Sequence, residues 1–86
     1  MITPGALAAL QKANQAPEHF LDLHAGGSWG DLDAEDRRLN DQAIAHEDPD
    51  RQGRVLSAYL TRNQTKIWVI TEWDRSVTTI LLPDEY

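Results

Sequence analysis

The chain has 86 residues, of which 41% are hydrophobic and 26% charged, and its formal net charge is −6. This composition is typical of one small globular domain and excludes a disordered tail. The absence of cysteine excludes a disulfide framework and a thiolate zinc site, and no apolar run approaches membrane-spanning length. We therefore expect a single domain over residues 1–86, located in the cytoplasm, with no membrane partner.

Charge is unevenly distributed along the chain. Ten acidic residues and two basic ones lie between Glu18 and Asp50, whereas five basic residues and two acidic ones lie between Arg51 and Arg75. Nucleic-acid binding needs a positive field, so direct DNA binding is not expected. The simplest interpretation of the acidic half is a solvated helix.

Two short helices are predicted at the start of the chain. Thr3 and Pro4 suit the N-cap and first position of a helix that ends near Asn14. Pro17 begins a second helical segment, which we expect to run from residue 17 to residue 23 before Gly26 stops it.

The segment from residue 24 to residue 36 combines a glycine-rich loop with a helix start. Three glycines surround Trp29, and four acidic residues follow within six positions. Glycine reaches positive φ at little steric cost, so this loop is built for shape, with the tryptophan as its anchor. Asp33 suits the N-cap of the main helix, whose signals fade at His46, and a loop is expected over residues 47–50.

Three strands are predicted over residues 54–62, 66–73 and 77–82, with turns at residues 63–64 and 74–76. Pro83 ends the last strand because proline cannot continue a ladder. The short connections favour an antiparallel meander. The predicted fold class is α+β: two or three N-terminal helices, in an acidic region over residues 1–50, pack on one face of a three-stranded antiparallel β-meander over residues 51–86. Trp68, in mid-strand, is expected to be buried.

Metal binding is weakly indicated. Asp31, Asp33 and Asp36 resemble the opening of a calcium loop, but the sixth position is Asp36 instead of glycine and the twelfth is Gln42 instead of glutamate. The three histidines, at positions 19, 24 and 46, lack a zinc-ligand spacing. We expect no metal and no cofactor, with helix capping as the role of these acids.

Nucleolytic chemistry is an alternative. A metal-independent RNase needs a general base, a general acid and a cation that stabilises the phosphorane. His24, Glu72 and Arg75 supply these groups if the glycine-rich loop folds against the second hairpin. The competing interpretation is an exposed turn at residues 72–75 whose local ion pairs contribute little.

Protein recognition is the third candidate. Tryptophans beside shaped loops and turns are residue types that anchor interfaces, and neighbouring carboxylates can present a phosphate-like array to a basic groove. The alternative for Trp29 is packing under its own loop. A further alternative is a structural subunit that dimerises through an open sheet edge. The predicted partner-binding residues are Trp29, Asp31, Asp33, Glu35, Asp36, Trp73 and Asp74.

The segments over residues 24–40 and 54–86, including the closing Leu82-Pro83, resemble a family of small plasmid-related bacterial proteins carried on plasmids, integrative elements and phages. The resemblance covers residues 20–86, with two departures: Ser28 replaces an expected acid and Trp73 an expected small residue. It implies a mobile genetic element as the source and no particular activity.

That setting favours an anti-defence inhibitor. Small acidic proteins of mobile DNA often inhibit restriction or CRISPR enzymes by occupying a basic nucleic-acid-binding surface. The leading interpretation is therefore a non-enzymatic acidic interaction protein whose partner is a protein with a basic surface, such as a nucleoprotein defence complex. A toxin-type RNase using His24, Glu72 and Arg75 is the alternative.

Overall fold

The computed structural model describes residues 1–30, 32–45, 54–72 and 74–86. Three helices, α1 (Pro4–Ala13), α2 (Pro17–Ala25) and α3 (Ala34–Ala45), precede three strands, β1 (Val55–Leu60), β2 (Lys66–Thr71) and β3 (Thr78–Leu81), and a closing 3-10 turn, η1 (Pro83–Glu85). The strands form an antiparallel sheet in the order β1-β2-β3. The predicted α+β arrangement of helices followed by a meander is thus confirmed.

Local capping explains where the helices begin and end. The Thr3 hydroxyl accepts a hydrogen bond from the Ala6 N–H, and α1 ends at Asn14, which has left-handed backbone angles. Helix α2 begins at Pro17 as predicted and extends to Ala25, past the predicted end at residue 23. The Asp33 carboxylate accepts from the Asp36 N–H at 2.8 Å, so its predicted N-cap role is confirmed. The predicted helix end at residue 46 and the loop at residues 47–50 lie outside the described residues.

The strands are shorter than predicted because turn geometry begins earlier. The Thr61 N–H donates to the Thr65 carbonyl and the Gln64 N–H to the Thr61 carbonyl, with Gln64 at a φ of 66°. These bonds close the β1–β2 hairpin directly after Leu60. Arg75, at a φ of 62°, bends the second connection in the same way. A left-handed residue cannot continue a strand, so each turn shortens the ladder beside it.

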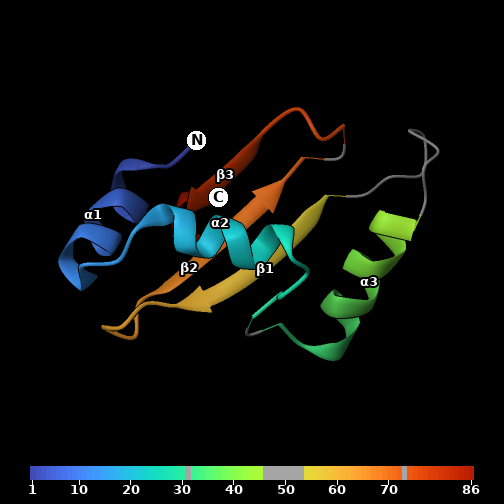
Figure 1. Ribbon diagram of the computed structural model, residues 1–86, viewed down its shortest axis with the longest axis horizontal. Coiled ribbons are helices and arrows are strands. Elements are labelled where there is room, and N and C mark those ends of the chain that lie inside the picture. Colours follow the sequence, from blue (N-terminus) through green and yellow to red (C-terminus); the bar gives the residue numbers. More distant parts are fainter. Residues whose placement is uncertain (31, 46–53, 73) are drawn as a thin grey trace.

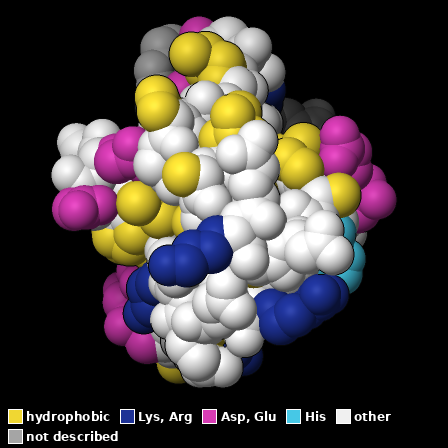
Figure 2. All heavy atoms as spheres, turned by 90° about the vertical axis from the view of Figure 1, so that its left-hand side faces the viewer, with side chains coloured by type: hydrophobic (Ala, Val, Ile, Leu, Met, Phe, Trp, Pro, Cys, Tyr) yellow, Lys and Arg dark blue, Asp and Glu magenta, His cyan; other side chains and the backbone are white. Residues whose placement is uncertain are grey.

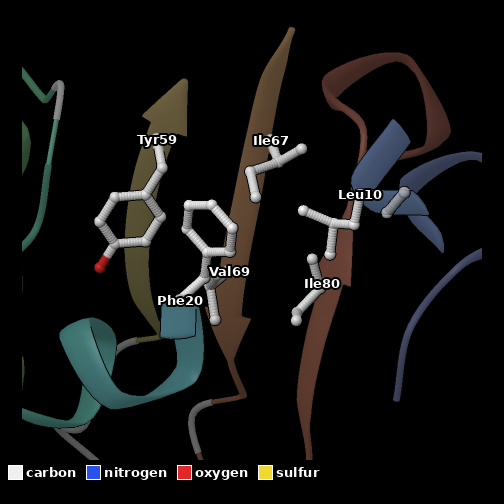
Figure 3. Close-up of a cluster of buried hydrophobic side chains, with 7 residues drawn as sticks. Leu10, Phe20, Tyr59, Ile67, Val69 and Ile80 are labelled. Atoms are coloured by element: carbon white, nitrogen blue, oxygen red, sulfur yellow. The ribbon is translucent and has the colours of Figure 1, made fainter. Parts of the chain in front are cut away.

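Helices α1 and α2 lie on one face of the sheet, and α3 lies beside β1 (Figure 1). The prediction that all helices cover one face is therefore wrong for α3. Side chains of α1, α2 and all three strands fill the core between the helices and the sheet, with Phe20 and Tyr59 side by side (Figure 3). The prediction of a buried Trp68 is also wrong, because its strand position turns it to the opposite face, where it is half-buried against Tyr86.

Both edges of the sheet carry added main-chain contacts. Along β3, the Ile80 N–H donates to the Met1 carbonyl and the Thr3 N–H to the Ile80 carbonyl, each at 2.9 Å. Along β1, the Ala58 N–H donates to the Trp29 carbonyl at 3.0 Å. Much of the edge that a second copy would need for strand pairing is therefore occupied. Among the described residues, none of the helices combines the length and apolar character needed to cross a bilayer.

Candidate interaction surface

Strand β1 holds the glycine-rich loop in place. Gly30 forms a parallel bridge with Ala58, and the Tyr59 hydroxyl donates to the Ser28 carbonyl at 2.5 Å. Gly30 has a φ of +76°, and a Cβ on it would lie 2.0 Å from the Ala58 carbonyl oxygen. Only glycine permits this approach. The loop that carries Trp29 is thus shaped by its contact with the strand edge.

The Asn40 side chain attaches helix α3 to the same edge. Asn40 is 3% exposed, and its amide donates to the Leu56 carbonyl at 2.5 Å while its carbonyl accepts from the Leu56 N–H at 3.0 Å. Because the loop and α3 share this edge, the half-buried Trp29 indole reaches Asp41 of α3, to which it donates at 3.4 Å. Asn40 and Asp41 were not among the predicted site residues, since their partners lie outside their own helix.

The predicted acidic cluster is present in part. Asp33 is exposed but caps α3, and Asp36 is half-buried. Glu35 forms an ion pair with Arg38 at 2.6 Å, and this hydrogen bond lowers the pKa of Glu35. The negative charge of Glu35 is thus balanced locally. Besides Glu35, the described acidic residues of this region are Asp33, Asp36 and Asp41, of which Asp41 contacts Trp29; these three and Trp29 are hereafter called the Trp29–α3 surface.

Arg37 contributes positive charge to the same region. Its guanidinium donates to the carbonyls of Leu32 and Gly30, each at 3.1 Å, and so ties the first turn of α3 to the loop. Two predicted partner-binding residues, Asp31 and Trp73, lie outside the described residues. Among the described residues of α3, Arg37 and Arg38 thus lie between the acidic positions.

Asp74, the remaining predicted contact residue, lies exposed in the turn between β2 and β3. Its carboxylate accepts from the Ser76 N–H at 3.0 Å, and hydrogen bonding to Ser76 lowers the pKa of Asp74. This carboxylate has a local role in forming the turn. On the end of the molecule that carries α1, acidic side chains lie toward the margins, and several Lys and Arg side chains lie in the lower half (Figure 2).

His24 belongs to a buried polar cluster that spans the sheet. It is 7% exposed, with Nδ1 2.5 Å from the Ser57 hydroxyl and Nε2 2.8 Å from the Thr71 hydroxyl. Thr71 in turn shares a 2.8 Å hydrogen bond with Thr78. Burial lowers the pKa of His24, and its ring lies edge-on to Trp29, 5.8 Å between centroids. The imidazole therefore serves as a neutral link between α2 and all three strands.

The RNase alternative gains no support from this geometry. Both ring nitrogens of His24 already have hydrogen-bonding partners, and the ring is closed off from solvent. The Glu72 N–H donates to the Val77 carbonyl, so the strand alternation continues and directs Glu72 to the face opposite Thr71 and His24. Arg75 is exposed in the following turn. A general base needs a free nitrogen within reach of substrate, which His24 does not offer.

In the part of the chain that the structure describes, no three His, Asp or Glu side chains converge as metal ligands would. No protein-family model, curated protein or solved structure matches this chain. The functional argument consequently depends on the geometry of the Trp29–α3 surface.

Proposed function

We propose that this chain is a small acidic interaction protein of a mobile genetic element, which inhibits a host defence enzyme by occupying its basic nucleic-acid-binding surface. The observation that carries the proposal is the shared attachment of the Trp29 loop and α3 to the edge of β1. It brings the Trp29 side chain next to a helix rich in acidic residues, with Trp29 and Asp41 in contact.

The arrangement suits recognition of a charged partner. Tryptophan is enriched among the residues that dominate interface energies, and carboxylates beside it give charge complementarity to a basic groove. The loop is fixed by Gly30 and by the Tyr59 hydroxyl before any partner binds. Such preorganisation reduces the entropy lost on binding. The setting on a mobile element comes from the resemblance to plasmid-related proteins. That setting is the reason for proposing a host defence enzyme as the partner.

The proposal is tested by transformation of bacteria that carry a restriction or CRISPR system with a plasmid targeted by that system. Expression of the chain should raise the transformation efficiency in cells with the defence system and leave it unchanged in cells without it. The variant Asp33→Asn/Asp36→Asn/Asp41→Asn removes three charges, while the helix keeps a good N-cap because asparagine caps as well as aspartate. We expect it to lose most of the inhibition.

The matched control is Glu18→Gln/Asp22→Asn/Asp84→Asn, which makes the same change in net charge at exposed positions away from Trp29. It should keep full inhibition. For a purified partner, the first variant should weaken binding by roughly tenfold, or about 1.4 kcal/mol, and added salt should narrow that difference. Equal inhibition by both variants would remove the Trp29–α3 surface from consideration, and no inhibition of any tested system by the unmodified chain would count against the anti-defence role.

A further inference from the structure

The outer edge of β1 has one open main-chain position between two occupied ones. Along an antiparallel strand, the N–H and C=O of successive residues point alternately toward one neighbour and the other. Thr61 pairs with Thr65 across the hairpin, so Tyr59, two residues before it, also points its N–H and C=O toward β2. The N–H and C=O of Leu56, Ala58 and Leu60 therefore point away from β2. Asn40 binds the Leu56 groups and the Trp29 carbonyl binds the Ala58 N–H. Among the described residues, no hydrogen bond reaches Leu60 from outside the sheet.

The open position is bounded on both sides. The Gly30 bridge to Ala58 lies before it, and beyond it the Arg62 N–H donates to the Gln15 side-chain carbonyl at 2.7 Å. The Leu60 side chain is 46% exposed. A strand edge with a free donor and acceptor is a template for another chain, and natural proteins usually cover such edges. Here the cover is interrupted at one residue.

A groove runs along this same stretch of the edge. Its volume is about 450 Å³, and its lining includes Phe20, Leu23 and Tyr59, with Gln15 and His19 as polar groups. The rings of Phe20 and Tyr59 lie side by side over the sheet (Figure 3). None of the described residues that line the groove is Asp, Glu, Lys or Arg. The volume falls within the range of about 300–1,000 Å³ that is usual for binding clefts.

We infer that this groove binds a short extended segment of a partner protein, which pairs with the main chain of Leu60 and places an uncharged apolar side chain against Phe20, Leu23 and Tyr59. The free main-chain pair selects an extended peptide, because strand addition uses these groups for affinity and neighbouring pockets for specificity. The uncharged lining selects an apolar side chain over a phosphate or a basic residue. This site shares the backbone of the Trp29 loop but uses neither the Trp29 indole nor the carboxylates of α3.

Leu60→Pro provides a specific test. Proline removes the outward N–H of residue 60, which the β1–β2 ladder does not use, and proline is tolerated on edge strands. Leu60→Ala is the matched control, since it shortens the side chain and keeps the N–H. A phage-displayed library of random heptapeptides is selected on the full chain, and the selected peptides are synthesised and titrated by calorimetry.

We expect selected peptides to share an apolar position and to lose roughly tenfold or more in affinity for Leu60→Pro, while Leu60→Ala keeps most of it. A copy of the peptide methylated at the pairing backbone nitrogen should bind equally poorly to the unmodified protein, which gives a test free of any folding defect. Hydrogen exchange of the Leu60 amide should slow when peptide binds. The variant Asp33→Asn/Asp36→Asn/Asp41→Asn should bind the peptides normally. Selection of no peptide above the unselected library, or equal binding to Leu60→Pro and Leu60→Ala, would overturn the inference.

Discussion

The side chain of Asn40 pairs with both main-chain groups of Leu56, and so helix α3 is joined to the edge of the sheet through one amide. This contact satisfies two polar groups that a strand edge otherwise leaves to solvent or to another chain. It also sets the position of the acidic helix relative to Trp29. Among the described side chains, α3 thus meets the sheet edge through a polar contact, whereas α1 and α2 contribute side chains to the apolar core.

Replacement of Asn40 with alanine should destabilise the fold and free α3. Two partly buried main-chain groups of Leu56 lose their partners, at a cost of about 1–3 kcal/mol. For a domain of this size, each kcal/mol lowers Tm by about 4–8 °C. Thermal unfolding measures the loss, and faster hydrogen exchange at Leu56 locates it. Gln42→Ala, at an exposed position of the same helix, should have little effect. Equal Tm values for the two variants would contradict this account.

Stability should fall as the pH decreases below about 6.5, the ordinary pKa of histidine, because burial lowers the pKa of His24 in the folded chain. The unfolded chain then binds a proton that the folded chain does not, so protonation favours unfolding in the interval between the two pKa values. Above this interval, the stability contributed by the buried neutral His24 is fully present. Urea unfolding between pH 7.5 and 5 (roughly the range that spans histidine titration) should show this slope.

The slope is assigned to residue 24 by substitution. His24→Asn removes the titrating ring, and its unfolding free energy should depend less on pH in this range, although the variant is less stable overall. His19→Gln replaces an exposed ring on the same helix and is the matched control. A pH dependence unchanged in His24→Asn would show that another group is responsible.

Two glycine variants separate backbone strain from steric overlap in the Trp29 loop. Gly27 and Gly30 both have positive φ, but a Cβ on Gly27 meets nothing closer than 4.0 Å, whereas one on Gly30 lies 2.0 Å from the Ala58 carbonyl oxygen. Gly27→Ala should cost about 1–2 kcal/mol from the left-handed backbone alone. Gly30→Ala should cost about 1–3 kcal/mol more, because the loop must leave β1. Equal free energies of unfolding for the two variants, measured with urea, would mean that the close approach of Gly30 to β1 does not contribute to stability.

Glu85 links the two ends of the chain and should matter more than its exposure indicates. Its carboxylate accepts from the Thr3 hydroxyl at 2.5 Å, the Leu82 N–H at 2.9 Å and the Gly5 N–H at 3.2 Å. These bonds, that to Thr3 first, lower the pKa of Glu85. The stability that ionised Glu85 gives to the folded chain is therefore present at neutral pH and lost as the pH falls through the range of carboxyl pKa values. Glu85→Ala should lower Tm at pH 7, with a smaller difference near pH 3 (below the ordinary range of carboxyl pKa values). Asp84→Ala is the control. An equal decrease of Tm in the two variants would contradict a specific role for Glu85 in joining the two ends of the chain.

Local signals in the sequence were sufficient for the elements themselves. Thr3, Pro17 and Asp33 mark helix starts because capping and φ restriction act within one turn of chain. Alternating apolar residues and short connections determined the antiparallel meander, since short loops cannot make a parallel crossover. The end of the first strand was overestimated, because the alternation continues to Arg62 in the sequence whereas the hairpin bonds begin at Thr61.

Only the tertiary structure decided what His24 and Trp29 contact and how α3 is attached. The burial of His24 by Ser57 and Thr71, the attachment of α3 through Asn40, and the contact between Trp29 and Asp41 join residues from separate elements. Spacing along one chain carries no information on such pairs, because their proximity follows from how the helices pack on the sheet. Composition determined the acidic charge and helical spacing the pairing of Glu35 with Arg38, whereas packing determined that Asp41 of the acidic helix meets Trp29.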